Sequence, residues 1–179
     1  WSLRGWLFFE KFGIARKQHM LDFSSQDVAA QLAKYAPART VPTMVTPEGA
    51  IVSDSLAIAE ELASRHPDAG LWPTDPLARA IARNLTAEMH SGFVALRSAC
   101  PMNLRTAYKD TTPSEDILAD LARLETIWDD AFDKCGGQGP WLCGEYSIAD
   151  AFYAPVAARI AGYGLPVRAR AQAYVAAHL

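Results

Sequence analysis

Two short apolar runs and one amphipathic stretch follow each other between residues 41 and 62. The runs 41–45 and 50–52 are β-prone, and the Pro-Glu-Gly sequence at 47–49 separates them, which predicts two strands joined by a turn. Apolar residues spaced three and four apart follow over 55–62, which predicts an amphipathic helix. This part of the chain is therefore predicted to be strand, turn, strand and helix.

The residues before this stretch are predicted to form two helices and one more strand. Apolar residues recur at helical spacing over 3–14, with Ser2 as a plausible N-cap and Gly13 as the stop. Residues 19–23 alternate weakly and predict a strand, and residues 25–36 predict a helix that ends at a proline. The order helix, strand, helix, strand, strand, helix favours an α/β layer with a small sheet.

A change of pattern marks the end of this part. Residues 67–75 are rich in Pro, Gly and Asp and lack helical spacing, which makes them the best linker candidate. Beyond them the pattern is all helical, with helices expected over 76–100, 114–135, 147–161 and from 167 to the end. The sequence therefore predicts two domains, 1–66 and 76–179.

Polar residues at three of these helix starts are typical N-caps. Asp75 precedes a proline at the first helical position, and Ser147 with Asp150 has the spacing of a capping box. Asp54 or Ser55 would cap the helix that follows the hairpin. That helix start would also present backbone N–H groups and a hydroxyl to an acidic small ligand, although these residues could serve only as caps.

Composition excludes several other classes of protein. The chain has 179 residues, half of them hydrophobic, and a net charge of −3 without a basic block, which argues against nucleic-acid binding. No apolar run approaches the roughly 20 residues of a membrane span. The three cysteines lack metal-ligand spacing, so no metal is expected, and they are interpreted as reduced thiols in a cytoplasmic protein, with Cys143 as a buried small hydrophobe.

Two motifs together resemble a known family. Val41-Pro42 before a strand, with Asp54-Ser55 after the hairpin, resembles the glutathione-binding half of the cytosolic glutathione S-transferases. Residues 144–150 resemble the second signature of that family, at the start of its buried core helix. The resemblance implies a thioredoxin-like α/β domain at 1–66 and an all-helical domain at 76–179. It also implies a first strand before Trp1, so the natural chain is expected to extend beyond both ends of this sequence.

The resemblance assigns roles to residues of the first domain. In the family the proline is cis, the residue before it pairs through its backbone with the cysteine of glutathione, and the acidic–Ser pair holds the γ-glutamyl end. The implied glutathione-binding residues are Thr40, Val41, Pro42, Asp54 and Ser55. Thr40, with Arg39 beside it, stands where a polar side chain often serves the glycyl end, and it departs from the usual pattern.

The family activates the glutathione thiol with a Tyr, Ser or Cys near the start of the first helix. Ser2 is the residue of this kind at the beginning of the sequence, and residues 1–4 resemble the end of a serine motif of zeta-like and related bacterial members. In those members the serine usually lies a few residues further upstream. Ser2 as the catalytic donor, Ser2 as a helix cap, and a donor before Trp1 all remain open.

A second-substrate site is expected between the domains, on the first long helix of the second one. His90, Phe93 or Val94, and Arg97 have the spacing of one helix face, and Arg105 lies just beyond. A cleft lined in this way would accept an electrophile with an aromatic or acidic part. The alternative is that Phe93 and Val94 belong to the core and that His90 and Arg97 lie in solvent.

The leading expectation is a glutathione S-transferase that conjugates glutathione to a small electrophile. One alternative is a zeta-like isomerase, in which glutathione is a cofactor regained in each cycle. Another is a non-catalytic binding or assembly protein, because a fold does not determine function. The family resemblance also implies a homodimer.

Overall fold

The structure, a computed structural model, describes residues 2–24, 27–137 and 139–179. The chain divides into two compact units, Trp1–Leu71 and Trp72–Leu179. The division falls within residues 67–75, the segment proposed as the linker.

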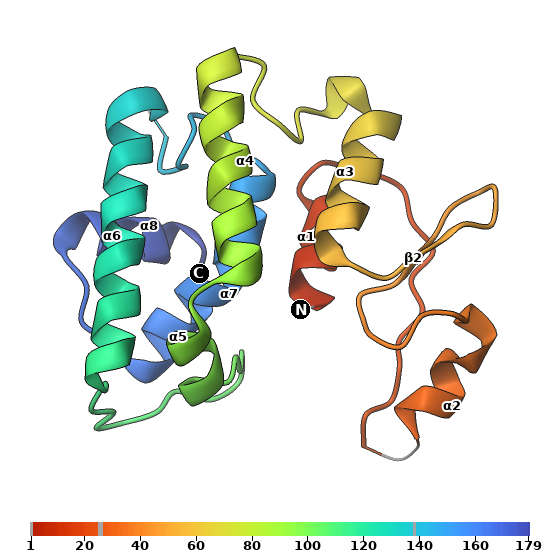
Figure 1. Ribbon diagram of the computed structural model, residues 1–179, viewed down its shortest axis with the longest axis horizontal. Coiled ribbons are helices and arrows are strands. Elements are labelled where there is room, and N and C mark those ends of the chain that lie inside the picture. The colour runs from red at the N-terminus through yellow and green to blue at the C-terminus, as the bar shows by residue number, and fades with distance from the viewer. Residues whose placement is uncertain (1, 25–26, 138) are drawn as a thin grey trace. The chain divides into compact units, whose positions relative to one another are not determined.

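The first unit is built from short helices and one hairpin (Figure 1). Its elements are α1 (Ser2–Glu10), α2 (Val28–Leu32), η1 (Ala33–Tyr35), β1 (Met44–Val45), β2 (Ile51–Val52), α3 (Ser55–Arg65) and η2 (Pro67–Ala69). Helix α1 packs against α3, and Phe8, Ile58 and Leu62 are buried in this unit. The predicted stop after α1 is confirmed, because Gly13 has φ +63° and the Ile14 amide donates to the Phe9 carbonyl at 2.9 Å.

The predicted hairpin is confirmed as an antiparallel pair, with Met44 opposite Val52 and Val45 opposite Ile51. The turn is closed by the Thr46 amide, which donates to the Ala50 carbonyl at 2.9 Å. The hairpin is tied to the end of α3 by Arg65, whose guanidinium donates to both carboxylate oxygens of Glu48 at 3.0 and 2.7 Å.

Two predicted elements of the first unit are wrong or shorter than expected. Residues 19–23 form no strand, and Met20 and Phe23 are exposed. A strand needs a partner for its backbone N–H and C=O groups, and no strand of the described residues pairs with this segment. The helix expected over 25–36 begins at Val28, because the Asp27 carboxylate caps it by accepting from the Ala29 amide at 2.8 Å. Residues 25 and 26 lie outside the described residues.

The second unit is helical throughout. Its helices are α4 (Pro76–Ser91), α5 (Val94–Ala99), α6 (Glu115–Cys135), α7 (Ile148–Tyr163) and α8 (Ala169–Ala177). The predicted cap at Asp75 is confirmed, since its carboxylate accepts from the Ala78 amide at 2.8 Å. The capping box of Ser147 and Asp150 is also confirmed.

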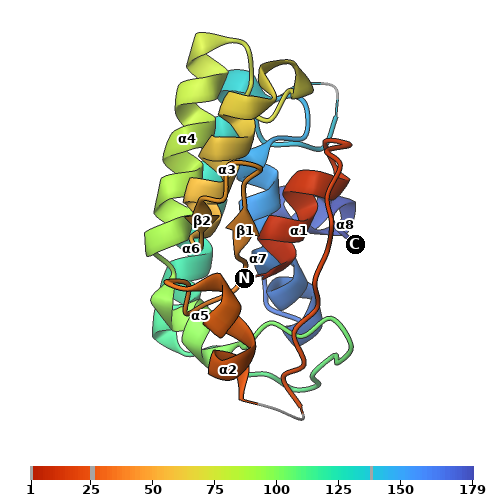
Figure 2. The same ribbon diagram turned by 90° about the vertical axis from the view of Figure 1, so that its right-hand side faces the viewer.

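Helix α7 is the core of the second unit, and α4 and α8 pack against it, while α6 packs against both of those helices (Figure 2). All residues from Ile148 to Ile160 are buried, as expected for a helix that is apolar on nearly every side. Trp128 of α6 meets Tyr153 of α7 edge to face at 5.4 Å between ring centroids. The Tyr153 hydroxyl donates to the Leu85 carbonyl of α4 at 2.9 Å, so one aromatic side chain links three helices.

None of the helices in the described part of the chain is long and apolar enough to cross a membrane.

Candidate functional site

The start of α3 is organised by Asp54. Its backbone is extended (φ −111°, ψ 136°), and its Oδ1 atom accepts from the amides of Leu56 and Ala57 at 2.8 and 3.1 Å. Asp54 is therefore the N-cap, and Ser55 is the first helical residue, with only 6% of its surface exposed. The helix start combines an exposed carboxylate with the positive end of the helix dipole.

The segment before β1 lies beside this helix start. The Thr40 hydroxyl donates to the carbonyl of Ser53 at 3.3 Å, and the Thr43 hydroxyl donates to the carbonyl of Thr40 at 2.7 Å. These bonds hold the residues around Val41 next to the β2–α3 connection. The Val41–Pro42 peptide bond is cis, as the family resemblance implies.

Helix α1 reaches the same segment at its first turn. A Cβ atom built on Gly5 would lie 2.7 Å from the Cβ atom of Pro42, which is closer than side chains come in real structures. Only glycine allows this approach. Ser2 precedes Gly5 by three residues and therefore shares its helix face, so the exposed Ser2 belongs to the face that touches Pro42.

Ser2 is the first residue of α1. Residue 1 lies outside the described residues. The interpretation of Ser2 as the cap of this helix is wrong, because its backbone is already helical.

The prediction that His90, Phe93 or Val94, and Arg97 share one helix face is wrong, because they do not lie on one continuous helix. The helix predicted over 76–100 breaks after Ser91, and Phe93 adopts the left-handed region with φ +57° before α5 begins. Phe93 is buried and Val94 is exposed. Arg105 lies in an irregular segment, and its side chain is exposed.

The break brings Arg97 back onto the end of α4. Its Nη1 atom donates to the carbonyls of His90 and Gly92 at 3.2 and 3.0 Å, which satisfies carbonyls that the helix leaves open. The His90 ring meets Phe152 edge to face at 6.0 Å between centroids. His90 and Arg97 are therefore in contact, but the contact joins the Arg97 guanidinium to the His90 backbone carbonyl at the end of α4.

Arg159 of α7 is a buried cation that the sequence analysis did not single out. It donates from Nε to the Cys100 carbonyl at 2.8 Å and from Nη1 to the Pro155 carbonyl at 3.0 Å. Burial lowers the pKa of Arg159, and the nearby charge of Arg97 lowers it further. The sequence does contain an indication of this buried cation. Arg159 lies in the largely apolar run 148–160, and arginine is almost never fully buried unless its charge is paired.

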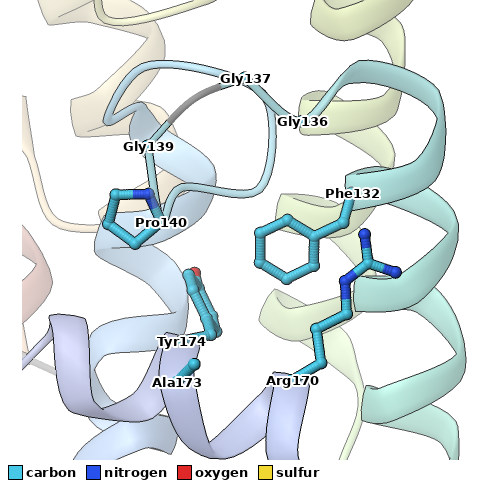
Figure 3. Close-up of a pocket in the computed structure, with 8 residues that line it drawn as sticks. All are labelled: Phe132, Gly136, Gly137, Gly139, Pro140, Arg170, Ala173 and Tyr174. Atoms are coloured by element: carbon cyan, nitrogen blue, oxygen red, sulfur yellow. The ribbon is translucent and has the colours of Figure 1, made fainter.

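A cavity of about 270 Å³ lies between the end of α6 and α8 (Figure 3). Its charged member, Arg170, lies over the Phe132 ring at 4.9 Å from the centroid and pairs with Asp133 at 2.6 Å. The cavity therefore lacks an uncommitted charge for a ligand. Among the described residues, no group of three or more His, Cys, Asp or Glu side chains is arranged to hold a metal ion.

Comparisons with known proteins bear on the whole chain. Residues 1–65 match the family described as glutathione S-transferase, N-terminal domain. The probable maleylacetoacetate isomerase of Caenorhabditis elegans is 38% identical over 78 residues, which are 44% of this chain and 36% of that protein. The maleylacetoacetate isomerase of Dictyostelium discoideum is 30% identical over 118 residues, 64% of this chain and 53% of that protein. The matches thus span between about a third and about half of these relatives.

Solved structures show the same architecture. A glutathione transferase homologue from Burkholderia GL BGR1, with bound glutathione, superposes with a TM-score of 0.69 at 22% identity, covering 99% of this chain and 83% of that one. A maleylacetoacetate isomerase from Anaeromyxobacter dehalogenans, with bound dicarboxyethyl glutathione and citrate, superposes with a TM-score of 0.63 at 24% identity, covering 98% and 80%.

These likenesses define a glutathione S-transferase fold, with a thioredoxin-like N-terminal domain and a helical C-terminal domain. Within that fold, residues 1–65 match the glutathione S-transferase N-terminal domain.

Proposed function

We propose that this protein is a glutathione-dependent isomerase of the maleylacetoacetate type. The observation that carries the proposal is the identity of 38% and 30% to two proteins named as such isomerases. It favours the isomerase over the transferase that was the leading expectation from the motifs. A transferase acting on a small electrophile is the second candidate, since the fold of the Burkholderia glutathione transferase homologue is shared.

The start of α3 suits the γ-glutamyl end of glutathione. That end carries an ammonium and a carboxylate on one carbon. The Asp54 carboxylate would attract the ammonium, while the Ser55 hydroxyl and the positive end of the helix would favour the carboxylate. The glutathione bound to the Burkholderia homologue supports this ligand.

The segment 40–42 would hold the rest of the tripeptide. The Val41 backbone would pair with the cysteine of glutathione, beside Pro42, and Thr40 would lie toward the glycyl end. Because the Thr40 hydroxyl donates its hydrogen to Ser53, it would act toward a ligand as an acceptor.

Ser2 is the proposed hydroxyl donor to the thiolate. Each unit by which a site lowers a thiol pKa corresponds to about 1.4 kcal/mol of preference for the anion. One hydroxyl donor beside a helix N-terminus would supply one or two such units. The contact of Gly5 with Pro42, on the face that Ser2 shares, supports this assignment.

The second substrate is proposed to be an acid. Arg97 and Arg159 lie close enough for the charge of one to lower the pKa of the other, and this concentration of positive charge would favour carboxylates. The dicarboxyethyl glutathione and citrate bound to the Anaeromyxobacter isomerase are ligands of this chemical class. His90 would border the site from the end of α4, Phe93 from the start of α5, and Arg105 from the segment after α5.

The chemistry requires little beyond a positioned thiolate. Its addition to a double bond conjugated with a carbonyl leaves a single bond, about which the substrate rotates. Expulsion of the thiolate then restores the double bond in the other configuration. No glutathione is consumed, so the protein would need only to hold the thiolate and the acid in reach of each other.

Product analysis tests the proposal. Purified protein is incubated with maleylacetoacetate and glutathione at one-hundredth of the substrate concentration, and the products are followed by NMR while free thiol is titrated. Complete conversion to the trans isomer with unchanged thiol is expected. Conversion that stops when the thiol is exhausted, with a thioether product, would instead establish a transferase.

A non-catalytic role would give neither result. Calorimetry would then separate a glutathione-binding protein from one that has lost the site. A homodimer is proposed from the family, and sedimentation of the purified protein would test it.

A further inference from the structure

Cys135 and Cys143 lie on two chain segments that run next to each other in the second unit. Cys135 is the last residue of α6, and Cys143 lies in the segment that leads into α7. The Sγ atom of Cys135 is 3.8 Å from the carbonyl oxygen of Leu142, the residue before Cys143. A Cβ atom built on Gly144, the residue after it, would lie 3.7 Å from the carbonyl oxygen of Cys135.

The two thiols are also near enough to affect each other, since Cys143 lowers the pKa of Cys135 and Cys135 raises the pKa of Cys143. Cys135 is half-buried, whereas Cys143 is 5% exposed. A reagent from solvent would therefore reach Cys135 first.

The chain between the two cysteines is short and rich in glycine. Figure 3 shows it as the loop that carries Gly136, Gly137, Gly139 and Pro140 beside the α6 end. A disulfide between the two cysteines would close this loop into a ring. It would leave the sequence of helices along the chain as it is. The third cysteine, Cys100, is buried and has no part in this pair.

We propose that Cys135 and Cys143 are a reversible redox pair, which a small disulfide such as oxidised glutathione converts into an intramolecular disulfide. In the first step the Cys135 sulfur attacks one sulfur of the oxidant, forming a mixed disulfide and releasing one glutathione thiol. In the second step the Cys143 sulfur attacks Cys135 and releases the second. The two cysteine protons leave with the two glutathione thiols, and the oxidant takes up both electrons.

The groups around the two thiols determine how fast Cys135 attacks the oxidant. Burial raises the pKa of Cys135, the carboxylates of Asp75 and Asp130 add to this effect, and Lys134 opposes it. Burial raises the pKa of Cys143 well above its ordinary range, with Asp150 as a further cause. The thiolate is the attacking form, so ring closure is expected to be slow at pH 7 and several-fold faster at pH 9.

Mass spectrometry of the whole protein after oxidation tests the pair. The reduced protein is exposed to oxidised glutathione at pH 7 and pH 9, unfolded in the presence of iodoacetamide, and digested with trypsin. No Lys or Arg lies between 134 and 159, so both cysteines appear in the single peptide 135–159, and Cys100 appears in the peptide 98–105. The expected peptide 135–159 has lost two hydrogen atoms, carries no iodoacetamide label, and recovers both thiols after reduction.

Two other results would overturn the proposal. One is a peptide 135–159 that iodoacetamide still labels at both cysteines after oxidation at pH 9. The other is a wild-type peptide that keeps one glutathione on Cys135 and never closes.

Variants identify the order of attack. Cys143→Ser is expected to accumulate one glutathione on Cys135, because the resolving thiol is missing. Cys135→Ser is expected to stay unmodified, because Cys143 is buried. Cys100→Ser serves as the matched control and should close the pair like the wild-type protein. If a variant fails to fold, the wild-type peptide still decides the question.

Discussion

Gly5 and Pro42 are in contact so close that no side chain at residue 5 would fit, since its Cβ atom would lie 2.7 Å from the Cβ atom of Pro42. The contact joins the helix that begins at Ser2 to the segment that carries Val41. It connects two parts of the proposed glutathione site that are far apart in sequence.

Gly5→Ala is therefore expected to weaken both the fold and glutathione binding. Overpacking of this kind costs about 1–3 kcal/mol, which exceeds the gain of about 0.5–1 kcal/mol from replacing a helical glycine. Displacement of Pro42 would also move Val41, so the glutathione dissociation constant should rise at least several-fold. Urea unfolding and calorimetry measure the two effects.

Gly162→Ala in α7 is the matched control for this change. Its Cβ atom would lie 3.6 Å from the carbonyl oxygen of Thr106, an ordinary contact. The same substitution should there be neutral or stabilising, by up to about 1 kcal/mol. Equal effects of the two substitutions would show that the contact with Pro42 does not constrain the fold.

Asp54→Asn is expected to separate ligand binding from helix capping. Asparagine caps a helix about as well as aspartate does, so the free energy of unfolding should change by less than about 0.5 kcal/mol. The lost charge should weaken glutathione binding by about 1.5–3 kcal/mol, the range for a hydrogen bond to a charged group. Asp54→Ala should lose the binding and about 1 kcal/mol of stability as well.

Asp75→Asn makes the same change at the N-cap of α4, where the carboxylate accepts from the Ala78 amide. It should leave glutathione affinity unchanged. Calorimetry in which Asp54→Asn binds as tightly as this control would remove Asp54 from the site.

Local signals in the sequence account for what was predicted correctly. The hairpin, the cap at Asp54 and the capping box of Ser147 each depend on residues within a few positions of each other. Turn and cap chemistry acts over that range, so a sequence shows it directly. The place of the proposed glutathione site therefore followed from the motif.

Contacts between distant residues account for what was missed. The apolar spacing of Phe93, Leu96 and Cys100 continues that of α4, which hid the break at Gly92. The strand expected at 19–23 depends on a partner strand that no local pattern supplies. A glycine in a helical pattern indicates a close approach, but not that Pro42 is what approaches Gly5.

Arg97→Met is expected to impair the use of acidic substrates selectively. The variant keeps the length of the side chain and removes the guanidinium, so the KM for an acidic electrophile should rise roughly tenfold, about 1.4 kcal/mol, while the KM for a neutral one stays the same. The carbonyls of His90 and Gly92 would lose a donor, so stability should fall by about 1 kcal/mol.

The exposed Arg105 provides a second arginine with which the effect of removing the Arg97 charge can be compared. Arg105→Met should shift the acidic KM less, and the double variant should show whether the two effects add. Kinetics in which acidic and neutral electrophiles suffer alike in the double variant would contradict recognition of an acid by these arginines.

Tyr174→Phe is expected to lower stability in a manner that depends on pH. The Tyr174 hydroxyl donates to the Oδ1 atom of the buried Asp150 at 3.0 Å. Burial raises the pKa of Asp150 from 3.8 to about 6, although this bond and those from Ser147 and the Leu142 amide oppose the rise. The folded protein thus binds this proton more tightly than the unfolded chain, so stability falls as pH rises from about 4 to about 6, by roughly 3 kcal/mol.

Loss of the hydroxyl would remove a donor that favours the charged carboxylate. The free energy of unfolding should therefore drop by about 1.5–3 kcal/mol at pH 8, where Asp150 is ionised, and by about 1 kcal/mol at pH 4.5, where it is protonated. Tyr153→Phe is the matched control, because that hydroxyl donates to the neutral Leu85 carbonyl at 2.9 Å. The loss of unfolding free energy in Tyr153→Phe should be the same at both pH values when measured by urea titration. An equally constant loss for Tyr174→Phe would mean that Asp150 does not titrate between them.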